Sequence, residues 1–231
     1  MNRLLSGSLI PILMSFMFCA WISTGFSPAK GATHVAHEHF HTKSSGSGGI
    51  TILFFGDSIT AGYGLDMEQA FPALIEAKAD SLGYSVEAVN AGVSGETSAG
   101  GLRRVDWILQ RPFDIFVLEL GANDGLRGVD PDHTRENLQQ IMDKVRSERP
   151  DVQIMLAGME APPNMGENYI RSFRKIYKDL ADENDVTFMP FILKDVAGEP
   201  NLNQPDGIHP TAEGHRIIAE NVWEILKPML R

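Results

Sequence analysis

Short apolar runs alternate with longer amphipathic segments along the chain after residue 49, and this alternation restricts the fold more than any other feature. The runs are rich in β-branched and aromatic side chains and are bounded by polar or glycine-containing segments, a pattern typical of buried strands. We predict five strands, at residues 50–55, 85–89, 115–120, 153–157 and 186–189.

Amphipathic helices separate these strands. Apolar residues recur at the spacing i, i+3, i+4 and i+7 within 138–145 and within 173–180, which places one apolar stripe on each helix. Asp130 and Pro131 precede the first of these as a capping carboxylate and a first-turn proline. Further helices are predicted at 69–81, 102–109 and 218–226. The alternation implies a five-stranded parallel sheet with helices on both faces, a three-layer α/β/α fold.

The N-terminal region differs from the rest of the chain. Residues 1–29 combine a positive start, an uncharged apolar stretch and small residues, which is the pattern of an export signal peptide. Cleavage after Gly25 or Ala29 satisfies the small-residue rule, whereas an uncleaved segment would anchor the protein in the membrane. Residues 30–49 are a flexible His-, Ser- and Gly-rich linker, and the folded domain spans 50–231. We expect an exported protein, periplasmic or secreted.

Composition narrows the choice of partners. The formal charge of −10 and the absence of a dense basic run argue against nucleic acid as a partner.

Cys19 is the only cysteine, so the domain must be stabilised by packing without a disulfide. The linker holds His34, His37, His39 and His41, but it supplies no rigid frame, so we expect a solvated tether and no metal site. A monomer is expected.

Residues suited to acyl transfer follow the predicted strands. Ser58 follows the first strand, and Asp206 and His209 follow the fifth. A serine hydroxyl needs a base to remove its proton, and that base needs a third group to hold its tautomer. A turn at Gly207 would bring the Asp206 carboxylate to the imidazole Nδ1 and leave Nε2 free to face Ser58. We predict a Ser58–His209–Asp206 catalytic triad, with Asp57 hydrogen-bonding within its own loop.

An oxyanion site is predicted at the same edge of the sheet, because ligands bind beyond the carboxyl ends of parallel strands. A tetrahedral intermediate needs N–H donors aimed at its oxyanion. The candidates are the backbone N–H of Ser58, the backbone N–H of Gly95 after the second strand, and the side-chain amide of Asn123 after the third. The residues expected to border the acyl chain, in the loop after the fourth strand, are Met159, Pro162 and Met165.

Four sequence blocks, in this order, resemble the signature of the SGNH (GDSL) hydrolase superfamily. They are Gly56-Asp57-Ser58, Gly95 within residues 93–98, Gly121-Ala122-Asn123-Asp124, and Asp206-Gly207-Ile208-His209-Pro210. Residues 118–128 are also similar to the exported arylesterase and multifunctional acyl-CoA thioesterase/lysophospholipase branch. The resemblance covers residues 50–230 and implies a flavodoxin-like sheet of order 2-1-3-4-5, with the same five residues in the triad and the oxyanion site.

The predicted function is cofactor-free hydrolysis of a small-molecule or lipid ester, or of a thioester, through an acyl-enzyme. Alternatives on the same fold are a carbohydrate acetyl esterase and a catalytically silent module that binds a glycan or lipid. A metallophosphoesterase is disfavoured because the domain offers mainly His209 as a ligand. An α/β-hydrolase is disfavoured because Ser58 lacks the Gly-x-Ser-x-Gly motif. His133 and His215 have no carboxylate at short spacing and are expected at the surface or in packing.

Overall fold

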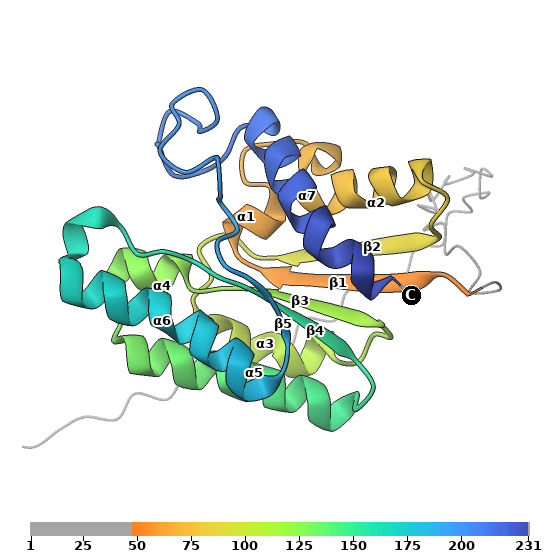
Figure 1. Cartoon of the computed structure of the whole chain (residues 1–231), viewed down its shortest axis with the longest axis horizontal. Helices are drawn as coiled ribbons and strands as arrows, with labels where there is room; N and C mark the ends of the chain where they lie inside the picture. The colour runs from red at the N-terminus through yellow and green to blue at the C-terminus, as the bar shows by residue number, and fades with distance from the viewer. Residues whose placement is uncertain (1–47, 231) are drawn as a thin grey trace, which may run out of the picture. The chain divides into compact units, whose positions relative to one another are not determined.

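A computed structural model describes residues 48–230, which contain a five-stranded sheet. The strands are β1 (Ile50–Gly56), β2 (Val86–Gly92), β3 (Ile115–Glu119), β4 (Gln153–Ala157) and β5 (Thr187–Met189). Their order across the sheet is β2-β1-β3-β4-β5, and each neighbouring pair is parallel (Figure 1). The order that the family resemblance implied is therefore confirmed.

Helices cover both faces of the sheet. The longer ones are α2 (Phe71–Ser81), α3 (Ser98–Ile108), α5 (Pro131–Glu148), α6 (Glu167–Asn184) and α7 (Ala212–Leu226). Short helical segments are α1 (Ser58–Ala61), α4 (Ala122–Arg127), η1 (Met67–Gln69), η2 (Pro163–Met165) and η3 (Lys227–Met229). α2 and α7 pack together over one face, and α3, α5 and α6 lie over the other (Figure 1). The predicted three-layer α/β/α fold is confirmed.

Burial explains the apolar character of the strands. All five residues of β3 are buried, because the strand is central and helices cover both of its faces. The one charged residue of β3 is Glu119, whose side chain is also fully buried. α5 begins as predicted, with Pro131 in its first turn and the Asp130 carboxylate accepting a hydrogen bond from the backbone N–H of Asp132.

β2 is longer than its apolar pattern predicts. Its pairing with β1 continues to Gly92, which lies opposite Gly56, and so includes the polar Asn90. The Asn90 side-chain amide donates to the carbonyl of Thr60 at 2.8 Å, which ties β2 to α1. A Cβ at Gly92 would lie 2.2 Å from the backbone nitrogen of Ala61, so only glycine lets α1 pack this closely against the end of β2.

The predicted signal peptide at 1–29 and nearly all of the linker at 30–49 lie outside the described residues, as do Cys19 and the four linker histidines. Export, anchoring and the domain boundaries therefore stay predictions from the sequence. Within residues 48–230, no helix is long and apolar enough to cross a membrane.

His215 is a packing residue, and it makes a testable contribution to stability. Its side chain on α7 is 1% exposed, and its Nδ1 accepts a hydrogen bond from the backbone N–H of Phe71 at 3.1 Å. Burial lowers the pKa of His215 to about 4. The His215 imidazole of the unfolded chain therefore takes up a proton at a higher pH than that of the folded chain. As a result, the free energy of unfolding that neutral His215 contributes is lost as pH falls from about 6.5 towards 4.

Urea unfolding of the wild type and of His215→Gln at pH 4.5 and pH 7 tests this. The glutamine can accept the same N–H but does not titrate, so the wild type should gain about 2 to 3 kcal/mol relative to the variant on going to pH 7. The carboxyl groups shared by both proteins cancel in the difference. A difference that does not change with pH would contradict a neutral, buried His215.

Candidate active site

Ser58 lies at the carboxyl end of β1, as the first residue of α1. The turn into the helix is capped by Asp57, whose Oδ1 accepts a hydrogen bond from the backbone N–H of Ile59 at 3.0 Å. Ser58 is 8% exposed, so its hydroxyl has limited access to solvent. The predicted hydrogen-bonding role of Asp57 within its loop agrees with this geometry.

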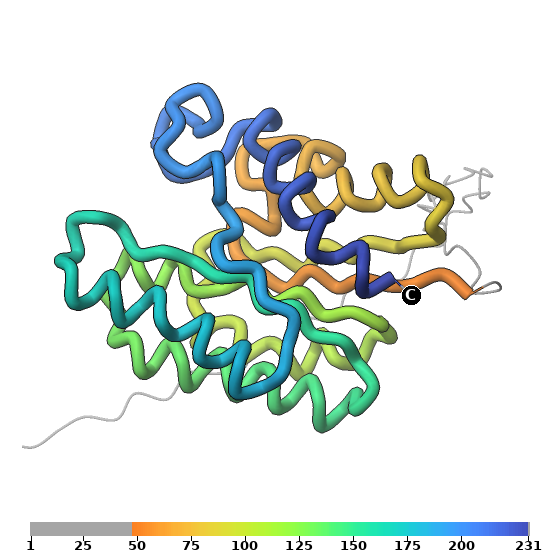
Figure 2. The backbone as a smooth tube through the Cα atoms, viewed as in Figure 1, coloured from red at the N-terminus to blue at the C-terminus, as the bar shows by residue number. Residues whose placement is uncertain are grey.

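His209 and Asp206 come from residues 190–211, the long segment between β5 and α7, which Figure 2 shows returning past the start of α1. The Asp206 Oδ2 lies 2.7 Å from the imidazole Nδ1, and the imidazole Nε2 lies 3.0 Å from the Ser58 Oγ. The three side chains predicted as a triad are thus brought together in hydrogen-bond contact. Gly207 between them has a φ of 71°, a left-handed conformation that suits glycine.

The Asp206 carboxylate also holds its own turn. Its Oδ1 accepts hydrogen bonds from the backbone N–H groups of Ile208 at 2.9 Å and His209 at 3.0 Å. The hydrogen bond to the His209 side chain, followed by those to the two backbone N–H groups, lowers the pKa of Asp206 to about 2. Asp206 is therefore a carboxylate at neutral pH, as the partner of a histidine base must be.

Two residues that the sequence did not indicate, Tyr63 and Gln204, connect the segment that carries His209 to the segment that carries Ser58. The ring of Tyr63, just after α1, lies 4.4 Å from the imidazole, centroid to centroid, and is 50% exposed. The Gln204 side-chain amide donates to the carbonyls of Tyr63 at 2.6 Å and Pro210 at 3.0 Å, so it ties the histidine segment to the serine segment. No local pattern could identify these residues, because Tyr63 and Gln204 lie 141 positions apart.

The three predicted oxyanion donors lie in the segments that follow β1, β2 and β3. The Asn123 side-chain amide is in the first turn of α4 and donates to the Asp57 Oδ2 at 3.2 Å. Gly95 is exposed and has a φ of 80°. Within residues 48–230, the backbone N–H groups of Ser58 and Gly95 donate to no internal acceptor, so both remain available to a ligand.

Charged side chains hold the Gly95 loop. Arg104 on α3 makes a bidentate pair with Glu96, with its Nε 2.8 Å from both carboxylate oxygens, and its Nη2 donates to the carbonyl of Ala91 at 2.8 Å. From the other side, the Arg127 Nη2 donates to the Gly95 carbonyl at 3.1 Å. Bidentate pairing with a planar guanidinium gives a defined geometry, so this loop has well-fixed supports.

The three residues predicted to border the acyl chain differ in burial. Met159 is 3% exposed and belongs to the hydrophobic core, whereas Pro162 and Met165 are half-buried. A Cβ at Gly128, just after α4, would lie 2.9 Å from the Met165 methyl carbon. Pro162 and Met165 therefore keep accessible surface, and Met165 lies near the end of the helix that carries Asn123, whereas Met159 is part of the core.

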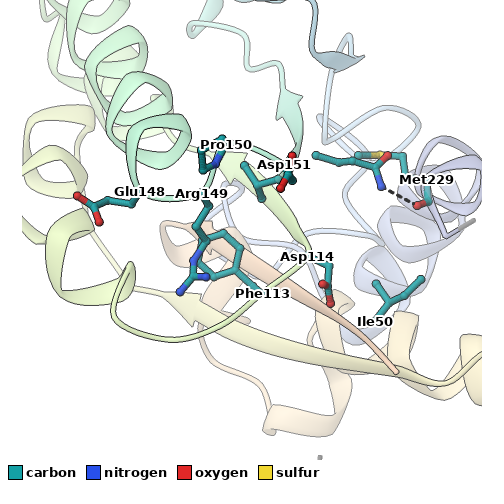
Figure 3. Close-up of a pocket in the computed structure, with 10 residues that line it drawn as sticks. Ile50, Phe113, Asp114, Glu148, Arg149, Pro150, Asp151 and Met229 are labelled. Carbon is teal, nitrogen blue, oxygen red and sulfur yellow. Dashed lines mark hydrogen bonds between the residues drawn. The ribbon is translucent and has the colours of Figure 1, made fainter. Parts of the chain in front are cut away.

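One hollow in residues 48–230 lies away from Ser58, at the amino ends of the strands. It has a volume of about 520 Å³. Its lining includes Ile50 at the start of β1 and Asp114 just before β3, and Arg149 lies there against the ring of Phe113 (Figure 3). Within the same residues, no group of three or more His, Cys, Asp or Glu side chains could hold a metal ion.

Comparison with known proteins identifies the family of this chain. Residues 54–217 match the model of the GDSL-like lipase/acylhydrolase family. The chain is 41% identical to the esterase TesA of Pseudomonas aeruginosa over 182 residues, which cover 78% of this chain and 89% of the relative. It is 38% identical to thioesterase 1/protease 1/lysophospholipase L1 of Escherichia coli K12 over 181 residues, which cover 78% of this chain and 85% of that relative.

Solved structures give the same result. The alignment with the crystal structure of TesA covers 78% of this chain and 99% of the TesA chain, with 40% identity and a TM-score of 0.74. The esterase EstA of a Pseudoalteromonas species was solved in a form inhibited by monoethylphosphonate. The alignment with it covers 78% of this chain and 98% of the EstA chain, with 33% identity and a TM-score of 0.74. The chain therefore belongs to the GDSL-like lipase/acylhydrolase family, the SGNH hydrolases.

Proposed function

We propose that the protein hydrolyses carboxylic esters or thioesters through an acyl-enzyme on Ser58. The observation that carries this proposal is the continuous hydrogen-bonded chain from the Ser58 Oγ to the His209 Nε2, and from its Nδ1 to Asp206, at 3.0 and 2.7 Å. A nucleophile, a base and an orienting carboxylate in contact are the requirements of nucleophilic acyl transfer.

The reaction has two stages. In the first, the Ser58 Oγ attacks the acyl carbonyl while its proton passes to the His209 Nε2, and Asp206 stabilises the resulting imidazolium. The donors of Ser58, Gly95 and Asn123 stabilise the oxyanion, and the alcohol or thiol leaves with the proton from His209. In the second, His209 takes a proton from water as the water oxygen attacks the acyl carbonyl. The bond between the Ser58 Oγ and the acyl group then breaks, Oγ takes that proton back from His209, and the carboxylic acid leaves.

A serine-directed fluorophosphonate, followed by peptide mass spectrometry, tests the nucleophile directly. We expect one phosphonyl adduct, on Ser58, with loss of hydrolysis in proportion to labelling. The exposed Ser81, which lies at the end of α2, is the internal control and should stay unmodified. Labelling at another residue, or full labelling without loss of activity, would refute the assignment.

A substrate panel tests the reaction class and its alternatives. It contains aryl esters of increasing chain length, acyl thioesters, lysophospholipid and acetylated sugars. The proposal predicts turnover of aryl esters or thioesters, whereas turnover confined to acetylated sugars would identify a carbohydrate esterase. A protein that is labelled at Ser58 but hydrolyses none of them would contradict the proposed function.

Met165 is proposed to border the acyl chain, since it is half-buried beside the segment that carries Asn123. Met165→Trp should lower kcat/KM for long-chain esters relative to acetyl esters by about 10-fold, because added bulk shortens the space for the chain. Met165→Leu, which conserves volume, should leave the profile within about 3-fold. An unchanged profile in the tryptophan variant would exclude the residue from the acyl site.

The proposal includes action outside the cytoplasm, on the basis of the signal-like residues 1–29. Mass spectrometry of the mature protein would show a new N-terminus after Gly25 or Ala29 if the signal is cleaved, and full-length protein in the membrane fraction if it is not.

A further inference from the structure

Glu119 is a buried carboxyl group directly beneath the serine turn, and the proposed mechanism gives it no role. It is the last residue of β3, in register with Gly56 of β1, and its side chain is 0% exposed. Its Oε2 accepts hydrogen bonds from the Thr60 hydroxyl at 2.7 Å and from the backbone N–H of Asp57 at 3.3 Å. A Cβ at Gly56 would lie 2.4 Å from the same oxygen, so the glycine of the serine motif makes room for this carboxyl group.

The surroundings of Glu119 favour its neutral, protonated form. Neither of its hydrogen-bond donors carries a positive charge, and its Oε1 has no partner within residues 48–230. Burial, followed by the nearby charge of Asp57, raises the pKa of Glu119 well above its ordinary value. Two adjacent buried carboxyl groups cannot both be ionised without a large electrostatic cost, so one of the pair retains a proton.

Asp57 is better placed than Glu119 to hold the negative charge. It is also 0% exposed, but its two oxygens accept hydrogen bonds from the Ile59 backbone N–H at 3.0 Å and the Asn123 amide at 3.2 Å. Burial raises the pKa of Asp57, and these two hydrogen bonds together with the charge of His209 oppose that rise. Asp124 is the remaining charged group that acts on it, and it favours the neutral form.

The charge on Asp57 determines which way the Asn123 amide faces. A carboxylate only accepts hydrogen bonds, so it selects the orientation in which the Asn123 NH₂ group faces it, leaving the second N–H of that group for the oxyanion. A protonated Asp57 could instead donate to the Asn123 carbonyl oxygen, which would place an acceptor where the oxyanion needs a donor. The protonation state of the buried pair is thus coupled to the oxyanion site.

We propose that Glu119 is a positioning residue, a neutral carboxylic acid that holds the serine turn and leaves the negative charge on Asp57, which in turn orients the Asn123 amide for the oxyanion. The inference rests on the proposed function, because it assumes that Asn123 stabilises the oxyanion. Glu119 acts through Asp57 and contacts no substrate atom.

A double-mutant cycle between Glu119 and Asn123 tests this, with kcat expressed per site titrated by a fluorophosphonate so that only folded enzyme is counted. Glu119→Leu should lower kcat by about 10- to 100-fold with KM nearly unchanged, and Asn123→Ala by about 100- to 1000-fold. The double variant should be no slower than Asn123→Ala alone, because both substitutions abolish the same interaction, the hydrogen bond from the Asn123 amide to the oxyanion. Glu119→Gln, which resembles the neutral acid, should retain kcat within about 3-fold.

The outcomes separate this inference from the proposed function. Multiplicative losses in the double variant, or a Glu119→Gln enzyme as slow as Glu119→Leu, would overturn the role of Glu119. An Asn123→Ala enzyme with full kcat would instead overturn the oxyanion assignment. If Glu119→Leu does not fold, Thr60→Val carries the same cycle, since it conserves volume and deletes only the 2.7 Å hydrogen bond to Glu119. Its smaller loss, about 3- to 10-fold, should likewise vanish in the Asn123→Ala background.

Discussion

Replacing Ser58 by alanine is expected to lower kcat by about 10⁴- to 10⁶-fold on every substrate that the enzyme hydrolyses. The hydroxyl is the group that forms the acyl-enzyme, and alanine leaves His209 with no nucleophile to activate. KM should change little, because the Ser58 backbone N–H and the rest of the site remain. Steady-state kinetics on an aryl ester, with burst-phase measurement of acyl-enzyme, gives both values.

Ser81→Ala is the matched control, since it removes an exposed serine hydroxyl from the end of α2. It should leave kcat within about 2-fold, as expected for a surface change away from the site. The assignment of Ser58 fails if its alanine variant retains more than about 1% of wild-type kcat while a burst of acyl-enzyme is still seen.

Asp206→Asn is expected to produce the second-largest loss, about 10³- to 10⁴-fold in kcat. An amide facing the imidazole Nδ1 favours the tautomer that carries its proton on Nε2, and that tautomer cannot accept the Ser58 proton. The asparagine oxygen can still accept the backbone N–H groups of Ile208 and His209, so the turn should be retained. The loss should therefore fall on kcat more than on stability, which thermal unfolding measures independently.

Asp195→Asn is a suitable control for this prediction. Asp195 is an exposed carboxylate in the same segment between β5 and α7, and its φ of 62° is one that asparagine tolerates. It should leave kcat unchanged within about 2-fold. A loss of less than about 10-fold in Asp206→Asn would mean that another group orients His209, and would remove Asp206 from the triad.

Local patterns were sufficient for much of the fold and for the composition of the site. The alternation of strands and helices depends on which residues are buried, and burial leaves a period of 3.6 in a helix and a continuous apolar run in a central strand. The Asp206–His209 turn was predictable because its partners are three residues apart. β2 was predicted too short because its last residues pair through the backbone, which leaves no apolar pattern.

Longer-range features depended on the tertiary structure. Family resemblance, rather than periodicity, supplied the strand order, because periodicity does not say which strands are neighbours. The burial of Met159 and the packing of Tyr63 on His209 had no local signal.

The serine motif, Gly56-Asp57-Ser58, shows most clearly which features follow from the sequence and which follow from the tertiary structure. The sequence by itself determined that Gly56, Asp57 and Ser58 follow a buried strand, and that Ser58 has a hydroxyl suited to attack. Only the tertiary structure placed the Glu119 carboxyl under that turn and the Asn123 amide on Asp57. The physical reason is that these contacts are set by the parallel register of β1 and β3, in which Gly56 lies opposite Glu119, and register between strands more than 60 residues apart is a property of the packed sheet.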